Sequence, residues 1–229
     1  MVTCMGTLHR SLIPAPIMGS ADYAEPACRG REPSTSREQP YDGFRFLREW
    51  LRNPAATAAV APSGKALTSL ITRGVHAGMG AVLELGPGTG AFTQGLVRRG
   101  VAQRNLTLVE QNPTFARLLA KRFPDATILG IDAAELADTS RGGGRPFDAV
   151  ICGLGLRGMD ARQVEAIMRA AFTRMLPDAS LYLFTYGWKC SVPEDVLMRL
   201  GLGVERIGTT LRNVPPASVY RLATLSGSL

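Results

Sequence analysis

The stretch Val82-Leu83-Glu84-Leu85-Gly86-Pro87-Gly88-Thr89-Gly90 indicates the fold class of this chain. It reads as a buried strand that enters a glycine-rich turn and then a helix beginning near Phe92. Glycines at positions 86, 88 and 90 let the backbone turn tightly and leave no Cβ between the backbone and a bound molecule. The stretch therefore predicts a loop that binds a nucleotide-like cofactor at the carboxyl end of a strand.

Three carboxylates follow the pattern expected around such a loop. Glu84 precedes the first glycine by two residues, near the expected amino-acid end of the cofactor, and Glu110 directly follows the second predicted strand, where a carboxylate can accept from both hydroxyls of a ribose. Asp132, with Ala133 beside it, follows the third predicted strand and can accept from an adenine amino group. Asp132 fits equally well as the N-cap of a short helix over 133–138.

A dinucleotide-binding loop is an alternative interpretation of the same glycines. The relaxed pattern Gly86-x-Gly88-x-x-Ala91 satisfies the dinucleotide fingerprint. Glu84, the alternating glycines and Glu110 favour a different nucleotide-like cofactor, and nothing else in the chain indicates hydride chemistry.

Apolar runs alternate with amphipathic stretches along the rest of the chain. We expect strands at 81–85, 106–109, 126–129, 149–152 and 181–185, and helices at 92–99, 113–123 and 162–175. Each helix must return the chain to the same end of the sheet, so this order predicts an α/β fold with a mostly parallel twisted sheet and helices on both faces. Two later runs, 204–208 and 218–223, predict an antiparallel C-terminal edge.

The chain divides at about residue 40. Residues 1–40 mix proline, serine, glycine and charges without a period, which predicts a flexible N-terminal segment. Residues 41–229 then form one domain, which begins with helices at 42–53 and 62–75. The first of these carries Phe44, Leu47 and Leu51 at helical spacing, with arginines between them, so it either packs on the domain or helps the protein bind an anionic bilayer.

Composition limits the partners. The 26 basic residues exceed the 19 acidic ones, and the net charge of +7 lies within residues 41–229. A basic folded surface favours nucleic-acid phosphates or an anionic membrane, although it also serves ordinary solubility. The four cysteines form neither a C-x-x-C pair nor a disulfide framework, which fits a reducing cytoplasm, and no apolar run is long enough to span a bilayer. We expect no metal.

At the level of whole motifs, the chain resembles class I S-adenosylmethionine (SAM)-dependent methyltransferases, and more closely the bacterial phospholipid N-methyltransferases, which convert phosphatidylethanolamine to its methylated forms and phosphatidylcholine. The likeness extends from about Phe44 to Leu222. Its markers are Asn53-Pro54, Val60-Ala61-Pro62-Ser63-Gly64, the 83–90 loop, Leu106-Thr107-Leu108-Val109-Glu110, Phe184-Thr185-Tyr186-Gly187 and Asn213-Val214-Pro215-Pro216-Ala217-Ser218-Val219-Tyr220-Arg221. One departure is Cys152-Gly153-Leu154-Gly155-Leu156, where family members commonly have Ser-Gly-Leu-Pro-Leu.

This resemblance implies a Rossmann-like class I methyltransferase fold and SAM as the methyl donor, with S-adenosyl-L-homocysteine as the product. It implies SAM binding by Glu84, Gly86, Gly88 and Glu110, and Gly90, Asp132 and Ala133 complete the set that we predict from the loop and strand ends. It also implies a cytoplasmic enzyme that associates peripherally with the inner membrane.

A phospholipid head group presents an amine and a phosphate, so its site needs cations, hydroxyls or aromatic rings. Tyr186 and Lys189 follow the fifth strand, at the end of the sheet where ligands bind, and are the candidate catalytic residues. The candidate substrate-binding residues are Ser63, Lys65, Trp188, Arg212 and Tyr220. Tyr186 and Trp188 can also face a methylated ammonium through cation–π contact. Neither histidine of the chain lies near a strand end, so no general base is predicted.

Two other functions are compatible with the loop. RNA adenine N-methyltransferases share it, but they resemble one another in a polar, proline-containing and aromatic segment after the fourth strand, which grips a flipped base. The stretch Cys152–Leu156 has no such residues. A protein that binds SAM without catalysing a reaction is the other alternative. We expect an anionic membrane surface and a phospholipid substrate as partners and no nucleic acid, while the oligomeric state does not follow from the sequence.

Overall fold

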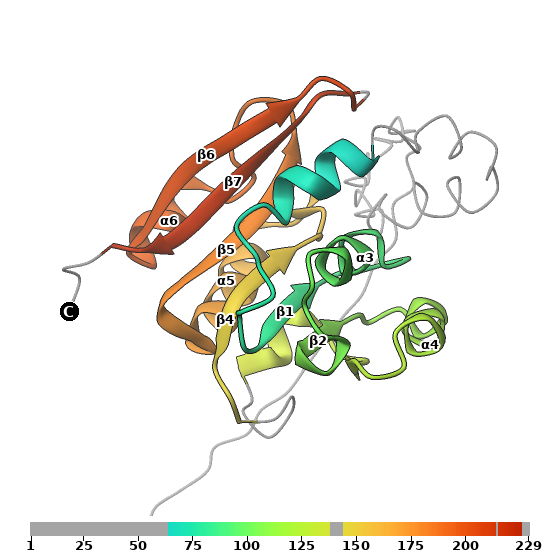
Figure 1. The fold of residues 1–229 in the computed structure, drawn as a ribbon. Coiled ribbons are helices and arrows are strands. Elements are labelled where there is room, and N and C mark those ends of the chain that lie inside the picture. The colour runs from blue at the N-terminus through green and yellow to red at the C-terminus, as the bar shows by residue number, and fades with distance from the viewer. Residues whose placement is uncertain (1–63, 138–143, 214, 226–229) are drawn as a thin grey trace, which may run out of the picture. The chain divides into compact units, whose positions relative to one another are not determined.

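A computed structural model describes residues 64–137, 144–213 and 215–225. The predicted 1–40 segment, the helix at 42–53 and Ser63 lie outside the described residues. Within the described part of the chain, seven strands form one sheet in the order β3-β2-β1-β4-β5-β7-β6 (Figure 1). They are β1 (Val82–Leu85), β2 (Leu106–Val109), β3 (Thr127–Leu129), β4 (Phe147–Cys152), β5 (Met175–Tyr186), β6 (Leu202–Thr210) and β7 (Ala217–Thr224).

The strand directions confirm the predicted α/β fold. Strands β3, β2, β1, β4 and β5 are parallel, and β7 runs antiparallel to both β5 and β6. The order reverses beside β1, and in open α/β sheets ligands bind outside the carboxyl ends of the strands at such a point. The glycine loop that follows β1 therefore stands where this fold places its ligand.

Helices cover both faces of the sheet because side chains of successive strand residues point to opposite faces. Val82, Leu108 and Ile151 pack in one core with the helical residues 64–71, α3 (Ala91–Arg98) and α4 (Pro113–Arg122). Leu83 and Val150 pack in the other core with α5 (Ala161–Thr173) and α6 (Glu194–Arg199). Short 3₁₀ turns η1 (Gln103–Asn105), η2 (Ala133–Ala137) and η3 (Leu156–Gly158) complete the connections.

The largest differences from the sequence prediction concern β5, the helix predicted at 62–75 and α6. The helix predicted at 162–175 ends at Thr173, and β5 begins at Met175, which pairs with Phe147 of β4. Pro177 lies inside that early part of β5, and because proline disfavours a strand, the sequence pattern did not predict a strand there. The helix predicted at 62–75 is helical only to residue 71 within its described part, and residues 72–74 form a turn. Six-residue α6 was not predicted, because a helix of that length shows no clear period.

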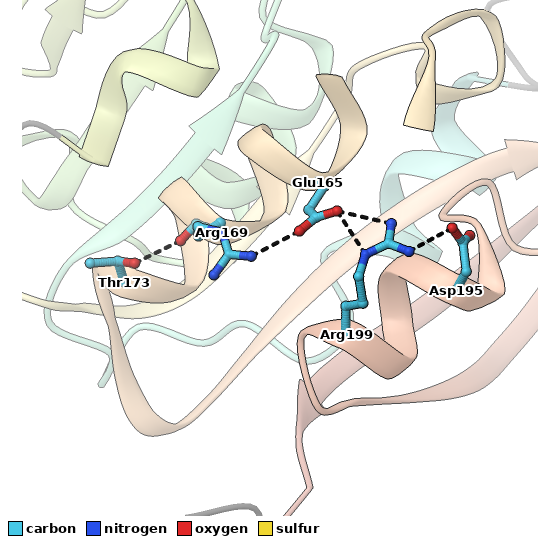
Figure 2. A network of polar contacts seen from close by, with 5 residues as sticks. All are labelled: Glu165, Arg169, Thr173, Asp195 and Arg199. Carbon is cyan, nitrogen blue, oxygen red and sulfur yellow. Dashed lines mark hydrogen bonds and ion pairs between the residues drawn. The ribbon is translucent and has the colours of Figure 1, made fainter. Parts of the chain in front are cut away.

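An exposed network of ion pairs joins α5 to α6 (Figure 2). Glu165 accepts from Arg169 at 2.8 Å and from Arg199 at 2.9 Å, and Arg199 also donates to Asp195 at 2.8 Å. The arginines lower the pKa of the Glu165 and Asp195 carboxyl groups. Because exposed pairs contribute little to stability, the buried apolar residues hold the two helices in place. No helix in the described ranges is long and apolar enough to cross a membrane.

Candidate cofactor and acceptor site

The glycine loop packs tightly between the ends of β1 and β4. Gly86 has a φ of 65° and donates its N–H to the Val109 carbonyl at 2.9 Å. A Cβ on Gly86 would lie 2.5 Å from Leu154 Cδ2, and a Cβ on Gly153 would lie 2.7 Å from the Gly86 carbonyl oxygen. Gly153 therefore requires glycine because its neighbour is backbone, whereas Gly86 favours glycine mainly for its left-handed backbone.

The other two glycines have different surroundings. A Cβ on Gly88 would meet no atom within 4 Å, and Gly88 lines the cavity above the loop. A Cβ on Gly90 would lie 2.7 Å from the Phe123 ring and 3.0 Å from Leu119. Gly88 thus leaves open space for a ligand, whereas Gly90 lets the start of α3 pack against α4.

Glu84 carries the strongest indication of a ligand-binding site. Its side chain is fully buried, and its Oε2 accepts from the Thr93 hydroxyl at 2.7 Å. Oε1 is also buried but has no hydrogen-bond partner. Burial raises the pKa of the carboxyl group to about 7, against the lowering effect of Thr93, and the nearby Glu110 raises it further. Since buried polar atoms are normally hydrogen-bonded, Oε1 fits a ligand that is cationic or donates a proton.

Glu110 joins the glycine loop to the next strand. The residue is 8% exposed, and its carboxylate accepts from two backbone N–H groups, with Oε2 accepting from Gly88 at 3.0 Å and Oε1 from Asn112 at 2.8 Å. A carboxylate oxygen has two lone pairs, so each oxygen retains capacity to accept from a hydroxyl. This fixed carboxylate beside open space at Gly88 fits the ribose of a nucleoside cofactor.

The third predicted carboxylate makes a local contact. Asp132 Oδ1 accepts from the Ala134 N–H at 2.9 Å, which caps the turn η2. Ala133 is buried and packs in the core on the α5 face. The contact that Asp132 makes is therefore the one expected of an N-cap, and its contact with adenine remains a prediction.

A cavity of about 810 Å³ opens above the glycine loop. Its volume is in the range of small-molecule sites. Its wall is formed by helix 64–71, the start of α3, the glycine loop, Gly153 and the end of β5. Among its described lining residues are Lys65, Phe92, Phe184, Tyr186 and Asn213, and we call the last four the acceptor wall.

Three aromatic rings and one amide form this acceptor wall. Phe92 and Phe184 pack edge to face at 5.6 Å between ring centroids, and Phe184 and Tyr186 pack the same way at 5.6 Å. Burial raises the pKa of the Tyr186 phenol, which is neutral at physiological pH. Asn213 is only 6% exposed, and its Oδ1 is buried without a hydrogen-bond partner. The wall thus offers apolar rings and one unsatisfied acceptor.

The structure brings only some of the predicted substrate residues to this cavity. Lys65 and Tyr186 line it, whereas Trp188 and Lys189 are exposed and are not among its described lining residues. Tyr220 is buried, and its hydroxyl donates to the Trp188 carbonyl. Ser218 likewise donates to the Gly187 carbonyl at 2.6 Å. Strand β7 therefore holds the loop that follows Tyr186, a positioning role rather than a direct contact.

Sequence reasoning missed four residues of the site. Thr93 contacts Glu84, while Phe92, Phe184 and Asn213 line the cavity. Phe184 and Asn213 did lie in marker segments of the resemblance. Nothing in the sequence, however, indicated that their side chains face one cavity.

Comparison with known proteins supports the fold and leaves the acceptor open. No protein-family profile matches the chain. A segment of 101 residues is 30% identical to the ornithine lipid N-methyltransferase of Singulisphaera acidiphila, and it covers 44% of this chain and 53% of that protein. A segment of 86 residues is 40% identical to the ribosomal RNA small subunit methyltransferase A of a Synechococcus species, covering 38% of this chain and 28% of that protein. The chain thus spans about half the length of the first of these relatives and less of the second.

Solved structures share the architecture. The N-methyltransferase NodS from Bradyrhizobium japonicum WM9, solved with S-adenosyl-L-homocysteine, is similar with a TM-score of 0.54 at 16% identity, over 72% of this chain and 87% of that chain. The strand order, the glycine loop and this similarity define the fold class: the chain has the Rossmann-like class I methyltransferase fold.

Proposed function

We propose that this protein is a SAM-dependent N-methyltransferase whose acceptor is the amino head group of phosphatidylethanolamine and its mono- and dimethylated forms, at an anionic membrane surface. The observation that carries the proposal is a pair of buried, unpartnered oxygens, Glu84 Oε1 and Asn213 Oδ1. One stands two residues before the glycine loop and suits a cationic cofactor. The other belongs to Asn213, a lining residue of the adjoining cavity, and suits an amine N–H.

The residues of the glycine loop would hold the cofactor. SAM, when bound, supplies a methyl group on a positively charged sulfur. Gly88 leaves its approach open, Glu110 accepts from its ribose hydroxyls, and the Glu84 carboxylate offers a negative charge to its cationic end. The fit rests on the open space at Gly88 and the orphaned Glu84 oxygen.

The acceptor wall would position the amine after its ammonium form has released a proton to solvent. Asn213 Oδ1 accepts one N–H of the primary or monomethylated amine and so directs the nitrogen lone pair, whereas the neutral dimethylated amine has no N–H and contacts the aromatic rings only. Phe92, Phe184 and Tyr186 would shield a bound amine from water in part, and this desolvation lowers the pKa of the amine and so favours its neutral form. Holding the two reactants in line contributes roughly 7–11 kcal/mol. Methyl transfer to the neutral amine forms an ammonium, and where that ammonium carries an N–H it releases the proton to solvent, so no side chain of the wall has to act as a general base.

The partial match to an ornithine lipid N-methyltransferase supports a lipid amine as the acceptor. RNA adenine methylation is the second candidate, favoured by the 40% identical segment of a ribosomal RNA methyltransferase and by the net charge of +7. The deciding experiment is transfer of labelled methyl from SAM to mixed vesicles that contain phosphatidylethanolamine, with structured RNA in parallel. Label in methylated lipid supports the proposal, and label in RNA alone overturns it.

Replacing Glu110 with alanine is expected to raise the dissociation constant for SAM by about 10–100-fold, since it removes the acceptor for the ribose hydroxyls at a cost of about 1–3 kcal/mol. Titration calorimetry measures the change. The matched control is Glu194→Ala, which removes an exposed carboxylate on α6. Equal affinities in wild type and Glu110→Ala would remove Glu110 from the cofactor site.

Replacing Asn213 with alanine is expected to lower the rate of methyl transfer to phosphatidylethanolamine by about 10–100-fold, because the amine loses its buried hydrogen-bond acceptor. Affinity for SAM should remain unaltered. Asn213→Asp keeps an acceptor oxygen and should retain more activity than Asn213→Ala. If both variants lose activity equally and unfold at lower temperature, Asn213 has a structural role only.

A further inference from the structure

A second cavity, of about 960 Å³, opens between helix 64–71 and the tip of the β6–β7 hairpin, which lie close together in Figure 1. The two segments approach at Gly208, where an added Cβ would lie 3.3 Å from Leu70 Cδ1. We call this cavity the basic groove. Its cationic lining residues are Lys65, Arg73, Arg99 and Arg212.

Among the described residues, the cations of the basic groove have no acidic partner. No aspartate or glutamate is among its described lining residues, and within the described chain Lys65, Arg73 and Arg212 form no ion pair. Arg99 is held in place, with Nε donating to the Thr72 hydroxyl at 2.9 Å and Nη2 to the Ser69 carbonyl at 3.1 Å. Like charges that converge in one cavity raise its potential and concentrate anions there. The groove is therefore suited to a phosphate.

The basic groove is continuous with the methyl-transfer cavity. Lys65, Ser69 and Arg99 line both cavities, so an anion in the groove would lie beside a ligand in the cavity above the glycine loop. A zwitterionic head group carries its phosphate and its amine within a few bonds of each other. The two cavities thus match the two charged groups of one such acceptor.

We propose that the basic groove binds the phosphate of the acceptor phospholipid while the amine of the same head group enters the cavity beside Asn213. This inference rests on the proposed function. Leu211 lines the groove next to Arg212 and is 70% exposed. An exposed apolar side chain beside arginines is typical of surfaces that contact a bilayer, and it favours a lipid phosphate over the phosphates of RNA.

The test uses the full chain and two charge-matched double variants. Arg73→Gln/Arg212→Gln removes two groove cations, and the control Arg104→Gln/Arg162→Gln removes two exposed arginines that line neither cavity. Each protein is assayed for methyl transfer to phosphatidylethanolamine in zwitterionic phosphatidylcholine vesicles, for flotation with these vesicles, for SAM affinity and for inhibition by inorganic phosphate. Binding of structured RNA is measured in parallel.

The groove variant is expected to raise the KM for phosphatidylethanolamine by about ten-fold or more and to lose inhibition by inorganic phosphate, with SAM affinity unaltered and the control like wild type. An unaltered KM in the groove variant overturns the proposal, and so does an equal rise in both variants. Loss of RNA binding with lipid kinetics unaltered also overturns it.

Flotation separates this proposal from the proposed function. If wild type methylates no lipid, yet only the groove variant loses vesicle binding, the proposed function fails and the phosphate site stands. If wild type methylates the lipid and the groove variant does so with the same KM, the function stands and the phosphate site fails.

Discussion

Replacing Glu84 with glutamine is expected to weaken SAM binding by about 10–100-fold and also to stabilise the ligand-free protein at neutral and alkaline pH. The first effect follows because the buried Oε1, which has no partner within the protein, no longer carries negative charge for a cationic ligand. The second follows because burial raises the pKa of the Glu84 carboxyl from 4.5 to about 7. The same burial that prepares the site therefore destabilises the empty protein.

The direction of the pH effect follows from proton binding. Between pH 4.5 and about 7 the folded protein holds a proton on Glu84 that the unfolded chain has released, so wild-type stability falls as pH rises through this window. For a fully buried Glu84 carboxyl group, the unfolding free energy falls by on the order of 3 kcal/mol across this window. A glutamine does not titrate, so Glu84→Gln should lose less stability than wild type between about pH 5 and pH 8.

Two measurements test the Glu84 prediction. Denaturant unfolding of the ligand-free protein at pH 5 and at pH 8 should show that Glu84→Gln loses less unfolding free energy than wild type. The control Glu194→Gln, at an exposed position of α6, should behave like wild type. Calorimetry should show that SAM affinity of wild type rises with pH up to about 7, since a cationic ligand favours the ionised carboxylate. An identical pH dependence of stability in wild type and Glu84→Gln would show that Glu84 does not titrate in this window.

Replacing Gly153 with alanine is expected to destabilise the fold by about 1–3 kcal/mol and to weaken SAM binding. The new Cβ would lie 2.7 Å from the Gly86 carbonyl oxygen and 3.4 Å from that of Leu85. Both contacts are with backbone, so the strain can be relieved only by moving the glycine loop.

Gly144→Ala is the matched control for this prediction. Its backbone is not left-handed, and an added Cβ there would meet no atom within 4 Å. Thermal unfolding and SAM calorimetry of both variants separate a local clash from a general effect of the added methyl group. Similar behaviour of the two alanine variants would mean that the loop accommodates the side chain without cost.

The sequence predicted the centre of the fold well because its strands are short apolar runs beside a glycine loop. Strand β2 was predicted to the residue, and the antiparallel edge was predicted from two later runs. The early part of β5 was missed because Pro177 disfavours a strand, and only pairing with β4 reveals it. A strand can be predicted where the spacing of its apolar residues reflects its burial. It cannot be predicted where pairing with a neighbouring strand decides the conformation.

The candidate site was less predictable from the sequence than the fold. The functions of Glu84 and Glu110 could be proposed because strand ends are recognisable, and both lie beside the glycine loop. By contrast, Arg73 and Arg99 follow the ends of two different helices, and only tertiary packing brings them together in the basic groove. Asn213 has no local signal, because its significance depends on burial without a partner.

The hydrogen bonds from Ser218 and Tyr220 to the loop after β5 have a consequence for how such proteins diverge. Glu84, the glycine loop and Glu110 lie in the first half of the described chain, whereas β7 supports the segment that carries Tyr186. Substitutions in the C-terminal hairpin can therefore move the acceptor wall while the half of the chain that carries the glycine loop keeps its sequence. A chimaera that exchanges only this hairpin between relatives should transfer acceptor preference and leave methyl-donor affinity with the parent.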